Sequence, residues 1–345
     1  GPFDATFHIP AFIEGKRLTI NGLHFVDKTP IDQTIFARDK IFGYETSNVK
    51  NLLFQKSKSQ INLDDIQNLF LSDLEILKDE ENNLVFKTLK NLKNNKHVIV
   101  DVENYSQLKN FSLIIKKLTK QKKFLFRTAA SFISSISEKK SNPQDEIFFS
   151  NLRIKNKEES FLPGLVIVGS YMELSTLQLK NLLEISTCEP IELDVFEFFR
   201  ISSSENNQKQ RNLFKNKFLR EIRFYFEKGK TPVLFTSRKF MSLDYSEQFN
   251  FYNSLAIFIA ELVKDLKYEI GYLISKGGIT TNVILSNGLN ADYVYLEGQI
   301  LTGISVVTYN LKNDEKLPIV THPGNIGTKD SLANIWKVFE NKNNL

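Results

Sequence analysis

Three glycine-containing segments in the second half of the chain have residue types that could bind an anionic group. Each follows a short apolar run, and they are Gly169-Ser170, residues 276–281 (KGGITT) and residues 324–327 (GNIG). Glycine lets the backbone approach a ligand closely, and backbone N–H groups at the start of a helix bind phosphate. A single Gly-Gly pair at a strand end is more often only a tight turn. Three such segments in one domain favour a phosphate site.

Side chains in the same segments could contribute to this site. Lys276 could add a positive charge, and Thr280 or Thr281 could add a hydroxyl group. The sequence contains neither GxxxxGK[ST] nor GxGxxG after a predicted strand, so these two phosphate-binding loops are excluded.

The elements that must position these segments alternate between strands and helices. Apolar runs of strand length are found at 97–102, 124–126, 165–168, 191–196, 232–236, 270–274, 293–296 and 319–321. Helical periodicity is found at 64–78, 105–119, 175–184, 207–228, 247–266 and from Ser331 onward. Residues 7–26 have the pattern of short strands with a turn at Asn21-Gly22. Alternation of this kind predicts an α/β fold with mainly parallel sheets, in which ligands bind beyond the carboxyl ends of the strands.

A polar, lysine-rich stretch at 137–160 predicts the domain boundary. We therefore expect two α/β domains, at 1–150 and 161–345, with helices on both faces of each sheet and the active-site cleft between the domains.

Composition and charge exclude several classes of protein. The 345 residues include 41% hydrophobic residues, one cysteine and four scattered histidines, which give no metal-ligand spacing. We find no apolar run long enough for a membrane span and no signal peptide, so we expect a cytoplasmic protein. The net charge of +5 is mild, and the lysines alternate with acidic residues. A nucleic-acid-binding module is therefore only an alternative.

Several segments resemble the four-carbon acid sugar kinase family. In the second half these are residues 274–280 (ISKGGIT), 296–303 (LEGQILTG), 323–327 (PGNIG), and Gly169-Ser170 with Gln178. In the first half they are residues 10–19 (PAFIEGKRLT), 34–39 (TIFARD) and 126–131 (FRTAAS). The chain differs from the usual pattern at 303–305, where the family has Gly-Val-Pro, and at His322, where many members have lysine.

The resemblance implies an ATP-dependent kinase that phosphorylates a hydroxyl of a four-carbon sugar acid, with ATP and Mg²⁺ as cofactors. The implied nucleotide-binding residues are Ser170, Lys276, Gly277, Gly278, Ile279, Thr280, Gly324, Asn325 and Gly327. The sugar acid is the expected partner, with a homodimer left open. Arg17 and Arg127 could hold its carboxylate, since arginine binds carboxylates with two hydrogen bonds. Asp101 could face the substrate, or cap the following helix. An ion pair at the surface or at a domain interface is the alternative for each arginine.

The family normally opens with an Asp-Asp-Xaa-Thr-Gly-Ala segment, which this sequence lacks. We therefore expect a substrate domain truncated at its N-terminus and a complete nucleotide domain. By resemblance the catalytic base would lie in the absent segment, so no base is assigned. A catalytically impaired or regulatory nucleotide-binding protein of the same fold is the alternative function.

Overall fold

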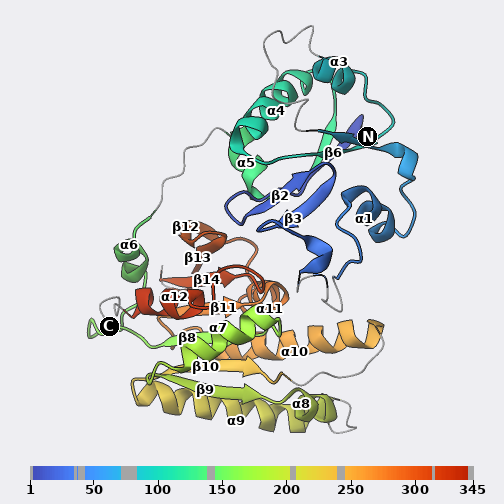
Figure 1. Ribbon diagram of the computed structural model, residues 1–345. Coiled ribbons are helices and arrows are strands. Elements are labelled where there is room, and N and C mark those ends of the chain that lie inside the picture. The colour runs from blue at the N-terminus through green and yellow to red at the C-terminus, as the bar shows by residue number, and fades with distance from the viewer. Residues whose placement is uncertain are drawn as a thin grey trace. The chain divides into compact units, whose positions relative to one another are not determined.

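The computed structural model describes residues 3–34, 37, 43–70, 84–137, 144–202, 207–238, 245–312 and 315–340 (Figure 1). The chain divides into two compact units, Gly1–Ser141 and Asn142–Leu345. The division falls within the polar stretch at 137–160. Helix α6 (Glu146–Asn151) is part of the second unit, although its residues fall partly within the range that the sequence assigned to the first domain.

The first unit has a parallel four-stranded sheet in the order β5-β6-β1-β7. Its strands are β1 (Ala5–Ile9), β5 (Ile66–Leu69), β6 (Lys96–Val100) and β7 (Phe124–Thr128). Helix α1 (Val49–Lys56) covers one face, and α3 (Leu84–Lys90), α4 (Tyr105–Leu118) and α5 (Ala130–Ser137) cover the other. Because side chains alternate along a strand, Val98 and Val100 of β6 pack with the α4 side while Ile99 packs with α1.

A small antiparallel sheet accompanies the parallel one and consists of β2 (Arg17–Ile20), β3 (Leu23–Val26) and β4 (Thr29–Pro30). Asn21 and Gly22 connect β2 to β3 with φ values of 52° and 73°. Positive φ at both central residues is the geometry that a two-residue hairpin needs, and Asn-Gly adopts it readily.

The second unit has a seven-stranded sheet in the order β12-β13-β14-β11-β8-β10-β9 within the described residues. Strands β8 (Gly164–Val168), β9 (Cys188–Leu193), β10 (Thr231–Thr236), β11 (Tyr272–Lys276) and β14 (Lys316–His322) are parallel. Strands β12 (Tyr295–Leu301) and β13 (Ile304–Asn310) form an antiparallel hairpin at one edge.

Helices cover both faces of this second sheet. On one face lie α8 (Val195–Ser202), α9 (Asn207–Glu227), α10 (Tyr245–Leu266), and α11 (Gly278–Val283) with its π-helical continuation Ile284–Gly288. On the other face lie α6, α7 (Glu173–Leu183) and α12 (Ser331–Phe339). The predicted fold class, two α/β units with mainly parallel sheets, is therefore confirmed.

Three details of the sequence prediction are corrected by the structure. The predicted helix at 64–78 is wrong at its start, because residues 66–69 form the edge strand β5; residues 71–78 lie outside the described part. Strand β13 and helix α8 were not predicted. The predicted strand at 191–196 runs past the end of β9, because Asp194 separates β9 from α8 and its side chain accepts hydrogen bonds from Phe196 N and Glu197 N in the first turn of α8.

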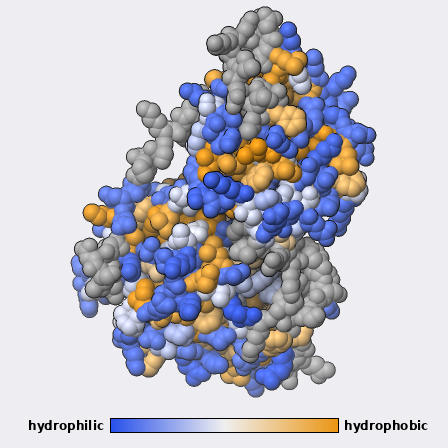
Figure 2. Space-filling view, in the orientation of Figure 1, coloured by the Kyte–Doolittle hydropathy of each residue, from blue (hydrophilic) through white to orange (hydrophobic). Residues whose placement is uncertain are grey.

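The surface of the described residues carries both hydrophilic and hydrophobic side chains (Figure 2), as the composition of 41% hydrophobic and 25% charged residues suggests. On the face shown in Figure 2, hydrophilic side chains occupy most of the area and hydrophobic ones form smaller areas between them. Among the described helices, none combines the length and apolar character needed to cross a membrane.

Candidate functional site

The three glycine segments meet at one edge of the second sheet. Strands β14, β11 and β8 are neighbours, so their carboxyl ends bring together Gly169-Ser170, residues 276–280 and residues 322–327. We call these residues the carboxyl-edge site. The backbone connects its parts directly: Gly169 N donates to Lys276 O at 3.0 Å, and Gly277 N donates to His322 O at 2.9 Å.

Side chains of α7 attach the third segment to the first. The hydroxyl of Ser175 donates to Gly324 O and lies 2.9 Å from the hydroxyl of Ser170. Farther along the helix, Gln178 Nε2 donates to Ile326 O at 3.2 Å and to Thr328 O at 2.7 Å. Gln178 is fully buried, so it positions the 324–327 loop rather than contacting a ligand.

The structural reason for glycine differs from one position of this site to another. A Cβ on Gly169 would lie 2.0 Å from Thr280 Oγ1, and one on Gly324 would lie 2.6 Å from Ser170 Oγ. Gly277 has φ of 125°, which L-residues with a side chain rarely adopt. A Cβ on Gly278 would meet nothing within 4 Å. Neither packing nor backbone conformation therefore requires glycine at 278, and the space beside it is open.

Helix α11 begins at Gly278, and its first N–H groups have no partner within the helix. Ile279 is 39% exposed, whereas Thr280 packs against Gly169. The hydroxyl of Thr281 lies 2.8 Å from that of Ser275. Of the two threonines considered from the sequence, Thr281 thus has its hydroxyl engaged inside the fold.

Lys276 brings a charge into the interior of this site. Its side chain is fully buried, and Nζ donates to Pro323 O at 2.9 Å and lies 3.3 Å from His322 Nδ1. Burial, together with the nearby Arg238 guanidinium, lowers the pKa of Lys276 to about 7. Burial and the nearby Lys276 lower the pKa of His322 to about 3, so this histidine is neutral at pH 7.

Two other predicted nucleotide residues lie in the 324–327 loop. Asn325 is exposed, and Gly327 has φ of 93°, with Ser331 directly beside it. The roles predicted for the nucleotide residues remain predictions, but the fold does bring all of them to one edge.

Sequence reasoning missed Arg238, which follows β10 at the same edge of the sheet. Its Nη1 donates to Ser170 O at 2.6 Å. Burial lowers the pKa of Arg238 to about 10, so the guanidinium is still charged at pH 7. A usable signal was present, because Arg238 stands two residues after a buried strand, as the glycine segments do.

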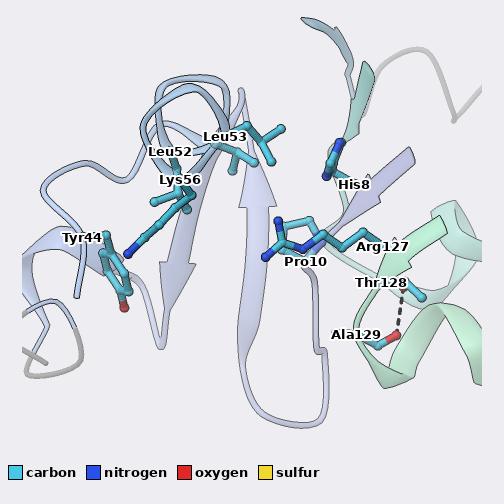
Figure 3. A pocket seen from close by; sticks show the side chains of 10 residues that line it. His8, Pro10, Tyr44, Leu52, Leu53, Lys56, Arg127, Thr128 and Ala129 are labelled. Carbon is cyan, nitrogen blue, oxygen red and sulfur yellow. Dashed lines mark hydrogen bonds between the residues drawn. The ribbon is translucent and has the colours of Figure 1, made fainter. Parts of the chain in front are cut away.

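A cavity of about 490 Å³ in the first unit contains one of the two arginines predicted to bind substrate (Figure 3). Its lining residues come from β1, α1, the segment before α1 and the end of β7, and they are His8, Pro10, Tyr44, Val49, Leu52, Leu53, Lys56, Arg127, Thr128 and Ala129. Among the described lining residues there are two basic side chains, Lys56 and Arg127, and no carboxylate. Lys56 Nζ donates to Gly43 O at 2.6 Å. Basic side chains in an apolar lining suit a small anion.

His8 lies at the wall of this cavity and pairs with a second histidine. Its Nε2 is 2.9 Å from His97 Nδ1, and the two rings are stacked. Burial, with smaller contributions from His97 and Arg127, lowers the pKa of His8 to about 4. The ring is therefore neutral at pH 7, and the positive charge of the cavity comes from Arg127 and Lys56.

The other two predicted substrate residues do not line this cavity. Arg17 is half-buried and lies near Tyr44, a lining residue whose charge influences the pKa of Arg17. Asp101 is fully buried, and Gly22 N donates to its two carboxylate oxygens at 3.0 and 3.3 Å. This geometry gives Asp101 a structural role at the β2–β3 turn. Helix α4 is capped by Asn104, not by Asp101.

Metal binding depends on acidic or other donor groups gathered at one place. Within the described ranges, no three histidine, cysteine or acidic side chains lie close enough together to hold a metal ion. Mg²⁺ commonly binds through phosphate oxygens and water with one or two carboxylates, so a protein cage is not needed for it to arrive with ATP. The Mg²⁺ prediction stays a prediction.

Comparison with known proteins identifies both units. Residues 2–136 match the family model of a sugar-binding N-terminal domain, and residues 165–332 match that of a nucleotide-binding C-terminal domain. The first match covers nearly all of the first unit, so a sugar-binding domain is present in this chain, whereas the sequence analysis expected only part of one. No curated protein matches the chain in sequence.

Two solved structures have a similar fold. A Salmonella typhimurium LT2 protein, described as a candidate tRNA synthase, has a TM-score of 0.61 at 13% identity, over 96% of this chain and 72% of that one. A Haemophilus influenzae protein of family DUF1537 has a TM-score of 0.53 at 16% identity, over 97% of this chain and 74% of that one. At such identities the likeness concerns the fold alone. The chain thus combines a sugar-binding N-terminal domain with a nucleotide-binding C-terminal domain, a pairing that fits the four-carbon acid sugar kinase family.

Proposed function

We propose that the chain is an ATP-dependent kinase that phosphorylates a hydroxyl of a four-carbon sugar acid. The observation that carries the proposal is the pairing of two anion sites of different character. The carboxyl-edge site has open backbone at Gly278 next to buried cations, which suits phosphates. The cavity of the first unit has Arg127 and Lys56 among apolar side chains, which suits a small organic acid.

In this proposal the nucleotide phosphates bind at the carboxyl-edge site. The N–H groups that open α11 and the 324–327 loop would contact phosphate oxygens, and Lys276 would supply positive charge. Phosphoryl transfer depends mainly on positioning and on charge neutralisation, and Mg²⁺ bound with ATP would contribute to the latter. Ser170 lies between Gly277 and Gly324, where its hydroxyl can contact the same phosphates.

The sugar acid would bind in the cavity of the first unit through its carboxylate. Arg127 can form two parallel hydrogen bonds with a carboxylate, and Lys56 can add a point charge. Because no catalytic base is assigned, the proposal concerns binding and the class of reaction.

The experiment is a titration with ATP, with and without Mg²⁺, followed by a screen of four-carbon sugar acids for acid-dependent release of ADP. The kinase proposal expects both binding and acid-dependent turnover. ATP binding without turnover on any acid would support a regulatory or catalytically impaired protein instead. If ATP does not bind, the nucleotide site itself is wrong.

A further inference from the structure

Arg238 lies at the carboxyl edge of the second sheet, beside the proposed nucleotide site. It follows β10, the neighbour of β8 on the side away from β11. Its Nη1 is fixed on Ser170 O at 2.6 Å. Its other two donor nitrogens, Nε and Nη2, are shielded from solvent and have no hydrogen-bond partner within the described chain.

The positions of these two nitrogens in the guanidinium group indicate which ligand they could bind. Nε and Nη2 lie on one edge of the planar guanidinium, and this edge matches two oxygens of a phosphate or a carboxylate. A buried donor without a partner is costly and needs an explanation. Since the hydrogen bond to Ser170 fixes the third nitrogen, the orientation of this free edge is set by the fold.

The charges around Arg238 favour an anion at this edge. Arg238 lies near enough to Lys276 for its charge to lower the pKa of the lysine, so two basic side chains lie close together here. The acid whose charge acts on Arg238 is Glu192, and its influence is smaller than that of burial. The ion pairs found within the described ranges do not include Arg238. Within the described residues, neither Arg238 nor Lys276 therefore forms an ion pair.

Arg238 is one of the residues that line a cavity of about 430 Å³. Arg238 and Phe235 line it on the β10 side, and Thr176 and Lys180 of α7 are among its other lining residues. The lining thus includes one further lysine, Lys180, and one glutamate, Glu184. Arg238 thus lines this cavity and, through its hydrogen bond to Ser170 O, also contacts the carboxyl-edge site.

We propose that Arg238 is a phosphate-binding residue, whose Nε–Nη2 edge holds two oxygens of one phosphate group while Nη1 remains on Ser170 O. The inference rests on the proposed nucleotide site and adds a phosphate ligand to it. The chemistry that Arg238 recognises is the oxyanion, so inorganic tripolyphosphate is also expected to bind there.

The test compares three variants of the full chain by isothermal titration with ATP, AMP and inorganic tripolyphosphate. R238Q removes the charge and the two adjacent donors, whereas R238K keeps the charge but not the two donors. R220Q is the control, because Arg220 is an exposed residue of α9. We expect R238Q to weaken ATP and tripolyphosphate at least about tenfold, equivalent to about 1.4 kcal/mol. AMP should lose less, R238K should recover part of the affinity, and R220Q should match the unchanged protein.

Thermal unfolding of each variant separates binding from folding. An R238Q protein that keeps its unfolding temperature, yet binds ATP and tripolyphosphate like the unchanged chain, overturns the inference. Equal losses for ATP and AMP, with no change for tripolyphosphate, also overturn it, because a role limited to shaping the Ser170 turn predicts that pattern. If R238Q does not fold, the R238K comparison decides in the same way. Unchanged protein that binds tripolyphosphate but not ATP contradicts the proposed function while leaving the Arg238 test intact.

Discussion

Gly278 offers a clean way to separate ligand binding from folding at the carboxyl-edge site. A Cβ at this position meets no heavy atom within 4 Å, and φ does not lie in the left-handed region. Gly278 is the first residue of α11, where alanine is favoured over glycine by up to about 1 kcal/mol. G278A should therefore fold with unchanged or slightly higher stability.

The same methyl group would occupy the open space into which we place the nucleotide phosphates. Forcing an extra methyl group into a filled contact costs about 1–3 kcal/mol. At about 1.4 kcal/mol per factor of ten, ATP affinity should fall roughly 5- to 150-fold. The measurement is an ATP titration of G278A together with its thermal unfolding curve.

Gly277 supplies the matched control, one residue earlier. Its φ of 125° makes a side chain strained, and a Cβ there would lie 3.2 Å from Ser170 N. G277A should lose about 1–3 kcal/mol of stability as well as affinity. A folded G278A protein that binds ATP as tightly as the unchanged chain would refute the placement of the phosphates beside Gly278.

Four further predictions concern charged side chains. Because burial lowers the pKa of Lys276 to about 7 and a bound anion favours the ammonium form, ATP binding should take up a proton near neutral pH and weaken as pH rises above about 7. Titrations in buffers of different ionisation enthalpy measure this uptake, and K276M should abolish it; equal uptake by both proteins would count against Lys276. Without ligand, the lowered pKa means that the Lys276 contribution to stability rises as pH increases from about 7 to the ordinary lysine range, which denaturant unfolding at several pH values can detect. R127Q should weaken sugar-acid binding at least about tenfold while ATP affinity stays unchanged, and unaltered acid binding would remove Arg127 from the site. D101A should lower the free energy of unfolding by about 1–3 kcal/mol, since Gly22 N loses its acceptor, and selective loss of acid affinity without destabilisation would instead make Asp101 a ligand contact.

The parallel core of the fold was predictable because buried parallel strands are continuous apolar runs. The runs that became β6, β8, β10 and β11 are of this kind, and each is fully or mostly buried. The edges were harder. β5 is a short edge strand whose apolar spacing also fits a helix, and the hairpin of β12 and β13 is irregular, with register shifts near Gly298.

The glycine segments of the candidate site were predictable, because glycine follows the end of a strand in each of them. A single side chain such as Arg238 was not predictable. The positions of glycines after apolar runs indicated the segments 276–281 and 324–327. The sheet order shows that the strands preceding them, β11 and β14, are neighbours. Arg238 carries no motif, and its importance depends on two nitrogens that only the folded chain leaves unpaired. Asp101 is a second case, because its carboxylate follows a strand end and accepts hydrogen bonds from Gly22 N, a partner that the sequence did not indicate. Its predicted contact with the substrate stays a prediction.

The most direct test of the central claim is one assay with a single readout, the ADP released from Mg-ATP in the presence of each four-carbon sugar acid in turn. The kinase proposal predicts that at least one acid raises ADP release above the level without acid, with equal amounts of ADP and of phosphorylated acid. The increase should be lost in both G278A and R127Q. ADP release that no acid increases, in a protein that binds ATP, would contradict the kinase proposal.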